Sequence, residues 1–320
     1  MHIKYYGELI AVCTALSWSI GIFPFTEAAR RLGPNPLNHF RIALAVVIIA
    51  ICAFAFFHTS PIQLFTTPLS YHWIWFGASG VVGLALGDYY GFTAFAILGP
   101  RIGSLFSTLA PTAALFLGYF VLDERINFIG ILGILVTIAG VAWLTLSRKD
   151  DNTNMQVHFG NKKKGIIFGV LSALCQGAGL VMAKKGLQHT IDGTEISVIQ
   201  ATFIRMTIAT AVMYSITIVR GKLKEMTKPI IDNQNNGLPH LAAGTFFGPV
   251  LGVGLSMYAV SLTAASVAQT IFSLVPVMVL PLAFFIKKEK ITTKAVLGSL
   301  LAIVGVIVLV WRDKISLFLG

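Results

Sequence analysis

Long apolar stretches separated by short polar connections dominate the chain. A helix needs about 20 mainly apolar residues to cross the hydrocarbon core of a bilayer. Ten stretches approach or exceed that length: residues 9–28, 36–57, 72–98, 102–122, 128–147, 165–183, 196–219, 238–264, 267–286 and 295–311. Lipid offers no partners for open backbone groups, and the alternating pattern of an outer-membrane barrel is absent. The pattern predicts an all-α integral membrane protein with about ten transmembrane helices.

The composition points to the same class. Of the 320 residues, 56% are hydrophobic and 12% are charged, against roughly 25% charged residues in soluble domains. The first stretch carries Glu8 and Glu27 at its ends and has no small-residue cleavage site, so we expect a retained helix and not a signal peptide. We therefore expect a multi-pass protein of the inner or plasma membrane.

The net charge of +11 lies almost wholly in the connections. Because no basic face is interleaved with aromatic residues, we do not expect nucleic acid as a partner. Arg41 and Arg205 lie inside expected spans, and the other 22 basic residues divide 16 to 6 between the two faces. The positive-inside rule makes the richer face cytoplasmic, which places both termini outside.

An internal duplication divides the chain. A shift of 165 overlays residues 78–142 on 243–307 without a gap. It aligns Gly83, Gly87, Leu109, Pro111, Glu124, Gly133 and Gly140 with Gly248, Gly252, Leu274, Pro276, Glu289, Gly298 and Gly305. We predict two five-helix repeats, residues 1–148 and 165–320, joined by a polar linker at 149–164. An odd number of spans inserts the second repeat upside down, and transporters built from inverted repeats bind their substrates at the repeat interface.

Three segments carry a resemblance to a known family. They are "ALSWSIG" (Ala15–Gly21), the run Leu109–Val141 and its counterpart Leu274–Val306. The chain resembles ten-helix, EamA-type members of the drug/metabolite transporter superfamily. The resemblance implies a basket of helices around a central cavity, the fifth helix of each half at the periphery, and movement of solute by alternating access. It also implies cytoplasmic termini, which disagrees with the charge bias, and the disagreement stays open.

Asp88 is the one acidic residue deep within an expected span, and its repeat mate is Val253. An ionisable group at that depth is costly and points to function. Arg41 on the preceding antiparallel span lies about 9 Å from the same face, against about 15 Å for Asp88, by the helical rise. We predict an Asp88–Arg41 pair. It is either a site for protons, cations and anionic groups or a structural pair between two helices.

Arg205 is the repeat mate of Arg41, near the opposite face. Two arginines, one near each opening of the expected cavity, would bind an anionic group in alternation. The competing interpretation is that the arginine side chains snorkel to the lipid headgroups. Other polar or amphipathic residues near mid-span mark the expected cavity or make helix–helix hydrogen bonds. They are Trp18, Ser107, Thr108, Gln176, Tyr258, Gln269, Thr270 and Ser273.

Proline and glycine predict local geometry. Pro111 and Pro276 predict kinks in the fourth and ninth spans, which are either hinges or static bends. Glycines at four-residue spacing predict close helix packing: Gly83, Gly87, Gly91, Gly248 and Gly252. Glu124 and Glu289 are interpreted as turn residues that fix the start of the last helix of each repeat.

These observations favour a secondary transporter of small metabolites that exports amino acids or related solutes. The alternatives are an uptake carrier or exchanger for organic anions and, from another class, a non-transporting scaffold or receptor. We find no enzyme motif, and we expect no cofactor or metal. The expected partners are a small-molecule substrate, membrane lipid, and protons or another coupling ion. Monomer and homodimer both stay open.

Overall fold

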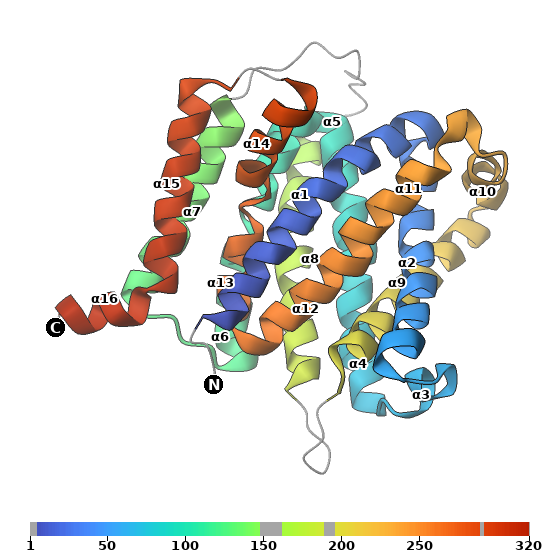
Figure 1. Ribbon diagram of the computed structural model, residues 1–320, viewed down its shortest axis with the longest axis horizontal. Coiled ribbons are helices and arrows are strands. Elements are labelled where there is room, and N and C mark those ends of the chain that lie inside the picture. Colours follow the sequence, from blue (N-terminus) through green and yellow to red (C-terminus); the bar gives the residue numbers. More distant parts are fainter. Residues whose placement is uncertain (1–4, 148–161, 189–195, 289–290, 320) are drawn as a thin grey trace.

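The computed structural model describes residues 5–147, 162–188, 196–288 and 291–319, and every regular element in these ranges is helical (Figure 1). The first half holds α1 (Tyr6–Leu32), α2 (Pro34–Phe57), α3 (Pro61–Thr66), α4 (Ser70–Ser79), η1 (Gly80–Leu86), α5 (Gly87–Ser107), α6 (Ala110–Leu122) and α7 (Phe128–Ser147). The second half begins with α8 (Lys162–Leu187), α9 (Val198–Val219), α10 (Leu223–Ile231), η2 (Gln234–Asn236), α11 (Leu238–Thr245) and η3 (Phe246–Gly252). It continues with α12 (Val253–Leu262), α13 (Ala265–Phe272), α14 (Val275–Lys287), α15 (Thr293–Val310) and α16 (Arg312–Leu319).

Nine helical segments in the described ranges are long and apolar enough to cross a membrane. They correspond to nine of the ten expected stretches, so the prediction of a helical, multi-span membrane protein is confirmed. The remaining stretch, 72–98, is helical too, as α4, η1 and α5, but it is not among the nine. It packs within the bundle against α8 and α9.

Each expected proline kink is a helix break. The fourth span is interrupted at Thr108 and Leu109, and Pro111 lies in the first turn of α6. In the same way Pro276 lies in the first turn of α14, after the break that ends α13. The first turn of a helix has no partner for its N–H groups, so proline fits there without losing a hydrogen bond. Both prolines thus lie where the helix of their span is interrupted, and their role as hinges or static bends stays a prediction.

Local geometry recurs between the halves. The π-helical segments η1 and η3 stand in register within one residue under the shift of 165. Asp123 and Lys288, also 165 apart, both end a helix in the left-handed conformation, with φ of 54° and 55°. Wide π turns are rare and are frequent at functional sites.

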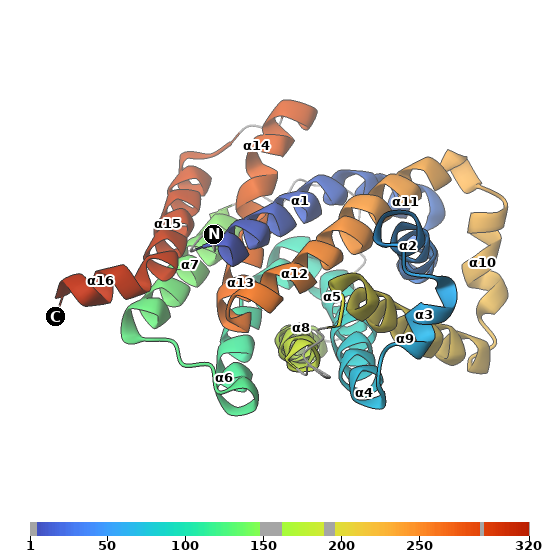
Figure 2. The ribbon, with the colours of Figure 1, turned by 60° about the horizontal axis from the view of Figure 1, so that its bottom comes forward.

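The first helix of each half crosses to the other half. α1 packs along α11 and α12, while α8 packs along α4 and α5 (Figures 1 and 2). The two fifth-span helices, α7 and α15, pair with each other at the edge of the bundle (Figure 2), as the resemblance implied. A Cβ at Gly140 would lie 2.7 Å from Cα of Ala302, so glycine is what lets these two backbones touch.

The glycines expected to pack helices line these crossings. A Cβ at Gly83 would lie 3.2 Å from Cα of Gly179 on α8, and one at Gly91 would lie 2.8 Å from Oγ of Ser172. Gly87 faces α8 through Cys175 and Gln176, while Gly248 and Gly252 lie against the Phe25 and Trp18 rings of α1. These five glycines thus bring the third span of each half against the first helix of the other half.

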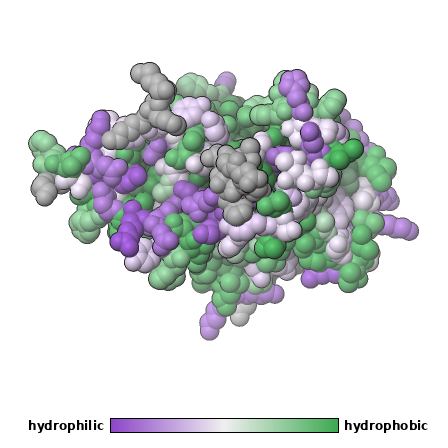
Figure 3. Space-filling model, turned by 90° about the horizontal axis from the view of Figure 1, so that it is seen from below, coloured by the Kyte–Doolittle hydropathy of each residue, from purple (hydrophilic) through white to green (hydrophobic). Residues whose placement is uncertain are grey.

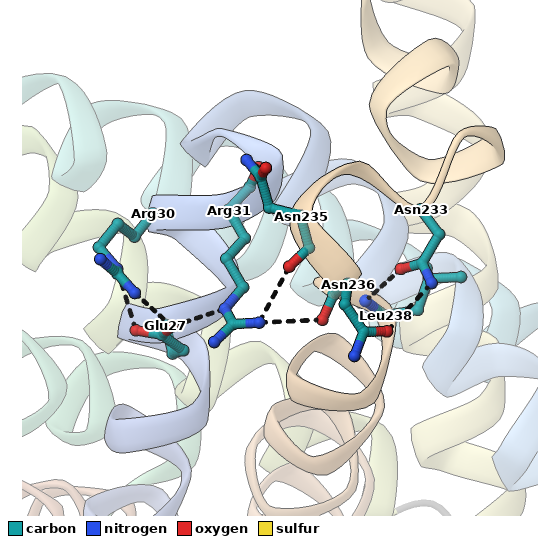
Figure 4. A network of polar contacts seen from close by, with 7 residues as sticks. All are labelled: Glu27, Arg30, Arg31, Asn233, Asn235, Asn236 and Leu238. Carbon is teal, nitrogen blue, oxygen red and sulfur yellow. Dashed lines mark hydrogen bonds and ion pairs between the residues drawn. The ribbon is translucent and has the colours of Figure 1, made fainter.

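The two faces of the bundle differ in their polar contacts. Both chain ends lie on one face (Figure 1), where hydrophilic side chains gather (Figure 3); we call it the terminus face. On the opposite face, Glu27 binds Arg30 and Arg31 at 2.7 and 2.5 Å (Figure 4). Arg31 Nη1 also donates to the carbonyls of Asn235 and Asn236 at 2.9 and 3.3 Å. This network ties the end of α1 to the connection between α10 and α11. Because it holds Arg30, Arg31 and the lysines around α10, we call this the basic face.

Candidate functional site

A cavity of about 200 Å³ lies where the two halves meet. Its walls come from α1, α2, η1 and α5 of the first half and from α9, η3 and α12 of the second. The lining residues are Trp18, Ile22, Phe25, Arg41, Ile42, Leu84, Asp88, Met206, Gly248, Pro249 and Val253. Two are charged and nearly all the others are apolar, which is typical of sites for small amphipathic molecules.

Arg41 and Asp88 form an ion pair in the cavity wall. Arg41 Nη2 donates to Asp88 Oδ2, and Arg41 Nε donates to Oδ1 of Asn38 at 3.0 Å. The guanidinium lies 5.7 Å from the ring centroid of Phe25 and 5.6 Å from that of Phe92, within the range of cation–π attraction. The two charged side chains are 16% and 19% exposed. The expected pair is present, and a small solute in the cavity would meet both of its charges.

Arg205 lies deeper. Its residue is 5% exposed, its Nη1 donates to the thioether of Met257 at 3.3 Å, and its Nε has no hydrogen-bond partner. No carboxylate of the described residues lies within ion-pair distance of it. The snorkelling interpretation is wrong, because the guanidinium is enclosed between η1 and α12 and does not reach a face of the bundle.

The remaining candidates lie outside the cavity wall, with one exception. Trp18 lines the cavity and packs edge-on against Phe272, with ring centroids 5.1 Å apart. The hydroxyls of Thr108, Thr270 and Ser273 donate to carbonyls three or four residues earlier in their own segments, which satisfies them locally.

The other four candidates are also elsewhere. Gln176 donates to Ser172 at 3.4 Å on its own helix, and Tyr258 packs against Tyr6. Ser107 is exposed and Gln269 is half-buried, and neither lines the cavity. Sequence reasoning in turn missed Phe25 and Met206, because nothing in an apolar span distinguishes a cavity-lining side chain from a core one.

Glu124 has a different role from the one predicted. Both its carboxylate oxygens accept the backbone N–H of Ala265, at 3.1 and 2.9 Å, so Glu124 caps α13 in the other half. The start of α7 is fixed instead by Asn127, whose Oδ1 accepts the N–H of Gly130 at 2.9 Å. The prediction for Glu124 was wrong because its partner is 141 residues away. Glu289 lies outside the described residues.

Glu124 is the centre of a polar cluster on the terminus face. Lys184 Nζ lies 2.6 Å from Glu124 Oε1 and donates to the carbonyl of Thr263 at 2.6 Å. The Thr263 hydroxyl donates to Glu8 Oε1 at 3.1 Å. We call Glu8, Glu124, Lys184 and Thr263 the terminus-side cluster; it borders a surface hollow of about 420 Å³. Two of its residues come from each half, so it joins the halves on this face.

Among the described residues, no group of three His, Cys, Asp or Glu side chains is arranged to hold a metal ion. The site therefore consists of an ion pair, aromatic and aliphatic walls, and a deeper arginine.

Comparisons with known proteins agree with this architecture. A crystal structure with 16% sequence identity superposes with a TM-score of 0.72, covering 95% of this chain and 96% of the other; this likeness shows the fold. An uncharacterized transporter of Clostridium kluyveri is 25% identical over 162 residues. That match spans 49% of this chain and about half (48%) of the length of the relative.

The EamA-like transporter family matches residues 5–146 and 163–311, which is nearly the whole chain. The chain therefore belongs to the EamA-like transporter family, a family of multi-pass membrane proteins.

Proposed function

We propose that the protein exports amino acids or closely related zwitterions, and that the Arg41–Asp88 pair binds the two charged groups of the solute. The observation that carries the proposal is a partly buried ion pair in the wall of an otherwise apolar cavity. An amino acid offers an ammonium group to Asp88 and a carboxylate to Arg41, so it can separate the pair and leave neither residue without an opposite charge.

The size and walls of the cavity support a small solute. Its volume of about 200 Å³ is below the roughly 300–1,000 Å³ of sites for drug-sized ligands. Trp18, Phe25 and Met206 provide apolar surface for the side chain of the solute. We therefore favour neutral amino acids with apolar side chains.

Solutes with one charge fit the pair less well. An organic cation bound to Asp88 would leave Arg41 unpaired, and leaving one partner of a buried pair alone costs about 3–5 kcal/mol. An organic anion is the second candidate, and Arg205 is the observation that favours it. With a second cation nearby, Asp88 could pair with one arginine while the anion pairs with the other.

Alternating access is supported by the arrangement of the halves. We propose that residues 1–148 and 165–320 are inverted repeats that move against each other about the cavity. The recurrence of η1 in η3, and the matching crossings of α1 and α8, are what this proposal predicts. On the terminus-face side of the cavity, the Trp18–Phe272 contact and the terminus-side cluster hold the halves together.

The depth of the cavity is what we use to propose a direction of transport. Phe25 lies seven residues before the end of α1, and Arg41 lies seven residues after the start of α2. Both are therefore about 10 Å from helix ends on the basic face. The proposal takes that face as cytoplasmic, following the positive-inside rule, so that the cavity in this state loads from the cytoplasm, as the proposed exporter requires.

Counterflow in proteoliposomes tests the proposal with three matched probes: L-leucine, L-leucinamide and 4-methylpentanoate. We expect uptake of L-leucine, and at least tenfold weaker uptake of the two probes that carry a single charge. Stronger uptake of 4-methylpentanoate would establish the organic-anion function in its place. Binding of L-leucine without flux would point to a receptor, and no interaction with any probe would refute the proposal.

A further inference from the structure

Arg205 is a buried cation that the resting site leaves without a carboxylate. Its carbonyl oxygen lies too close to Gly80 to leave room for a Cβ there, and its Nη2 lies 3.1 Å from the Cβ position of Gly83. The side chain therefore runs along η1 from Gly80 to Gly83, in the direction of Asp88. Asp88 follows Gly83 by five residues, about 7 Å along the helix.

The guanidinium lies beneath the floor of the cavity. Leu84, the neighbour of Gly83, lines the cavity, and so does Val253, one helical turn before Met257, which accepts the Nη1 hydrogen bond. Asp88 is also near enough to interact electrostatically with Arg205. The order across the site is therefore Arg41, Asp88 and Arg205, two cations with one anion between them.

In this arrangement Asp88 can form an ion pair with only one of the two arginines at a time. Asp88 binds Arg41 directly, while Arg205 has a thioether for one nitrogen and nothing for Nε. Sulfur is a weak acceptor, and a desolvated guanidinium needs strong acceptors, because it carries five N–H groups and stays charged. An arginine with only a structural role would be stabilised better by strong acceptors such as carboxylate or carbonyl oxygens.

We infer that Arg205 is the second carboxylate site of the transport path, which takes the carboxylate of the solute from Arg41 when the halves reorient. The inference rests on the proposed transport function. Arg41 and Arg205 lie on the second helix of their respective halves, near opposite faces, and they are 164 residues apart in a chain whose repeat is close to that length. In the state described here Arg41 borders the cavity and Arg205 is enclosed. When the halves reorient, Arg205 comes to border the cavity and Arg41 becomes enclosed.

The test separates binding from turnover. Purified wild type and Arg205→Gln are compared for L-leucine affinity in detergent and for L-leucine counterflow in proteoliposomes. We expect the affinity of Arg205→Gln to stay within threefold of wild type, because the resting cavity is intact, and its counterflow to fall at least tenfold. Arg41→Gln should instead lose at least tenfold in affinity. Arg220→Gln, an exposed arginine at the end of the same helix, should match wild type in both assays.

Three results would overturn the inference. They are counterflow of Arg205→Gln within twofold of wild type, a tenfold loss of its affinity, and equal losses in Arg205→Gln and Arg220→Gln. If Arg205→Gln is not recovered as a folded protein, Arg205→Lys decides. Lysine keeps the charge but cannot bind a carboxylate with two parallel hydrogen bonds. We expect its counterflow to fall about tenfold, and wild-type counterflow would refute the assignment.

Failure of this inference is distinguishable from failure of the proposed function. If wild type neither binds nor exchanges L-leucine or 4-methylpentanoate, the transport proposal itself fails. If wild type transports and the two Arg205 variants match it, the transport proposal stands and Arg205 has no part in it.

Discussion

Removal of Lys184 should open the terminus face. Its Nζ contacts both Glu124 and the carbonyl of Thr263 at 2.6 Å, and the two charged side chains are 14% and 11% exposed. Removing one partner of such a pair costs about 2–4 kcal/mol, the lower part of the range for buried pairs, because the adjoining hollow admits water. Since both contacts join the two halves, that free energy is lost mainly from the state in which this face is closed.

The effect on the conformational equilibrium follows from this loss of free energy. A change of 1.4 kcal/mol is tenfold in an equilibrium constant, so Lys184→Met should shift the equilibrium toward the terminus-open state by about 30- to 1,000-fold. A carrier that rests at 99:1 would reach comparable populations of both states with a shift of about 100-fold.

Ala15 is a suitable reporter of that opening. It is fully buried on α1, on the helical face between Glu8 of the cluster and Trp18 of the cavity. In a cysteine-less background, an Ala15→Cys reporter should react with a membrane-impermeant maleimide at least about 20-fold faster when Lys184→Met is added, because the open fraction rises from 1% to roughly a quarter or more. The matched control is Lys185→Met, because the neighbouring lysine forms no ion pair among the described residues. Glu124→Gln should show the same increase, and the double variant should add little. Equal labelling in Lys184→Met and Lys185→Met would refute the reasoning.

Three further perturbations test other parts of the molecule. The Cβ position of Gly7 lies 3.0 Å from Cβ of Leu262. A Gly7→Cys/Leu262→Cys pair should therefore form a disulfide that stops counterflow until reductant is added. Full counterflow after oxidation would contradict this prediction. Asp88→Asn keeps the shape of the side chain but removes its charge. Counterflow should therefore fall more than tenfold while expression and monodispersity are kept. An equal loss of counterflow and of expression would show that the Arg41–Asp88 pair is structural. Gly140→Val should lower the melting temperature in detergent, because overpacking the α7–α15 contact costs about 1–3 kcal/mol, whereas Gly254→Val, where no atom lies within 4 Å of the Cβ position, should not.

The sequence contained enough information to predict the Arg41–Asp88 pair. Antiparallel spans with known ends place residues at calculable depths, and two opposite charges at similar depth in lipid are expected to meet. The same reasoning gave no partner for Arg205, because its environment depends on how closely the glycines of η1 let α9 approach. Depth along a helix can be read from a sequence, but rotation about the helix axis and approach distance cannot.

Glu124 illustrates a second limit. Its position after the fourth span suggested a local turn, and its repeat mate Glu289 strengthened that interpretation. The structure gives it partners in the second half of the chain, Ala265 and Lys184. Contacts between segments far apart in the chain leave no periodic signal, so the residues that join the halves on the terminus face were not predictable from spacing. For the same reason Phe25 and Met206 were not identified as cavity residues.

The charge arrangement also predicts how transport depends on the solute. Without solute, Asp88 has to leave Arg41 before it can pair with Arg205, and separating an ion pair in a low-dielectric interior costs several kcal/mol. A bound zwitterion offers its carboxylate to the arginine and its ammonium to Asp88 during this exchange, so the loaded protein should reorient faster than the empty one. Efflux of labelled L-leucine from proteoliposomes should therefore accelerate at least fivefold when unlabelled L-leucine is added outside. If efflux into solute-free buffer is equally fast, the empty protein reorients without this penalty, and a carboxylate shared between Arg41 and Arg205 is not part of the cycle.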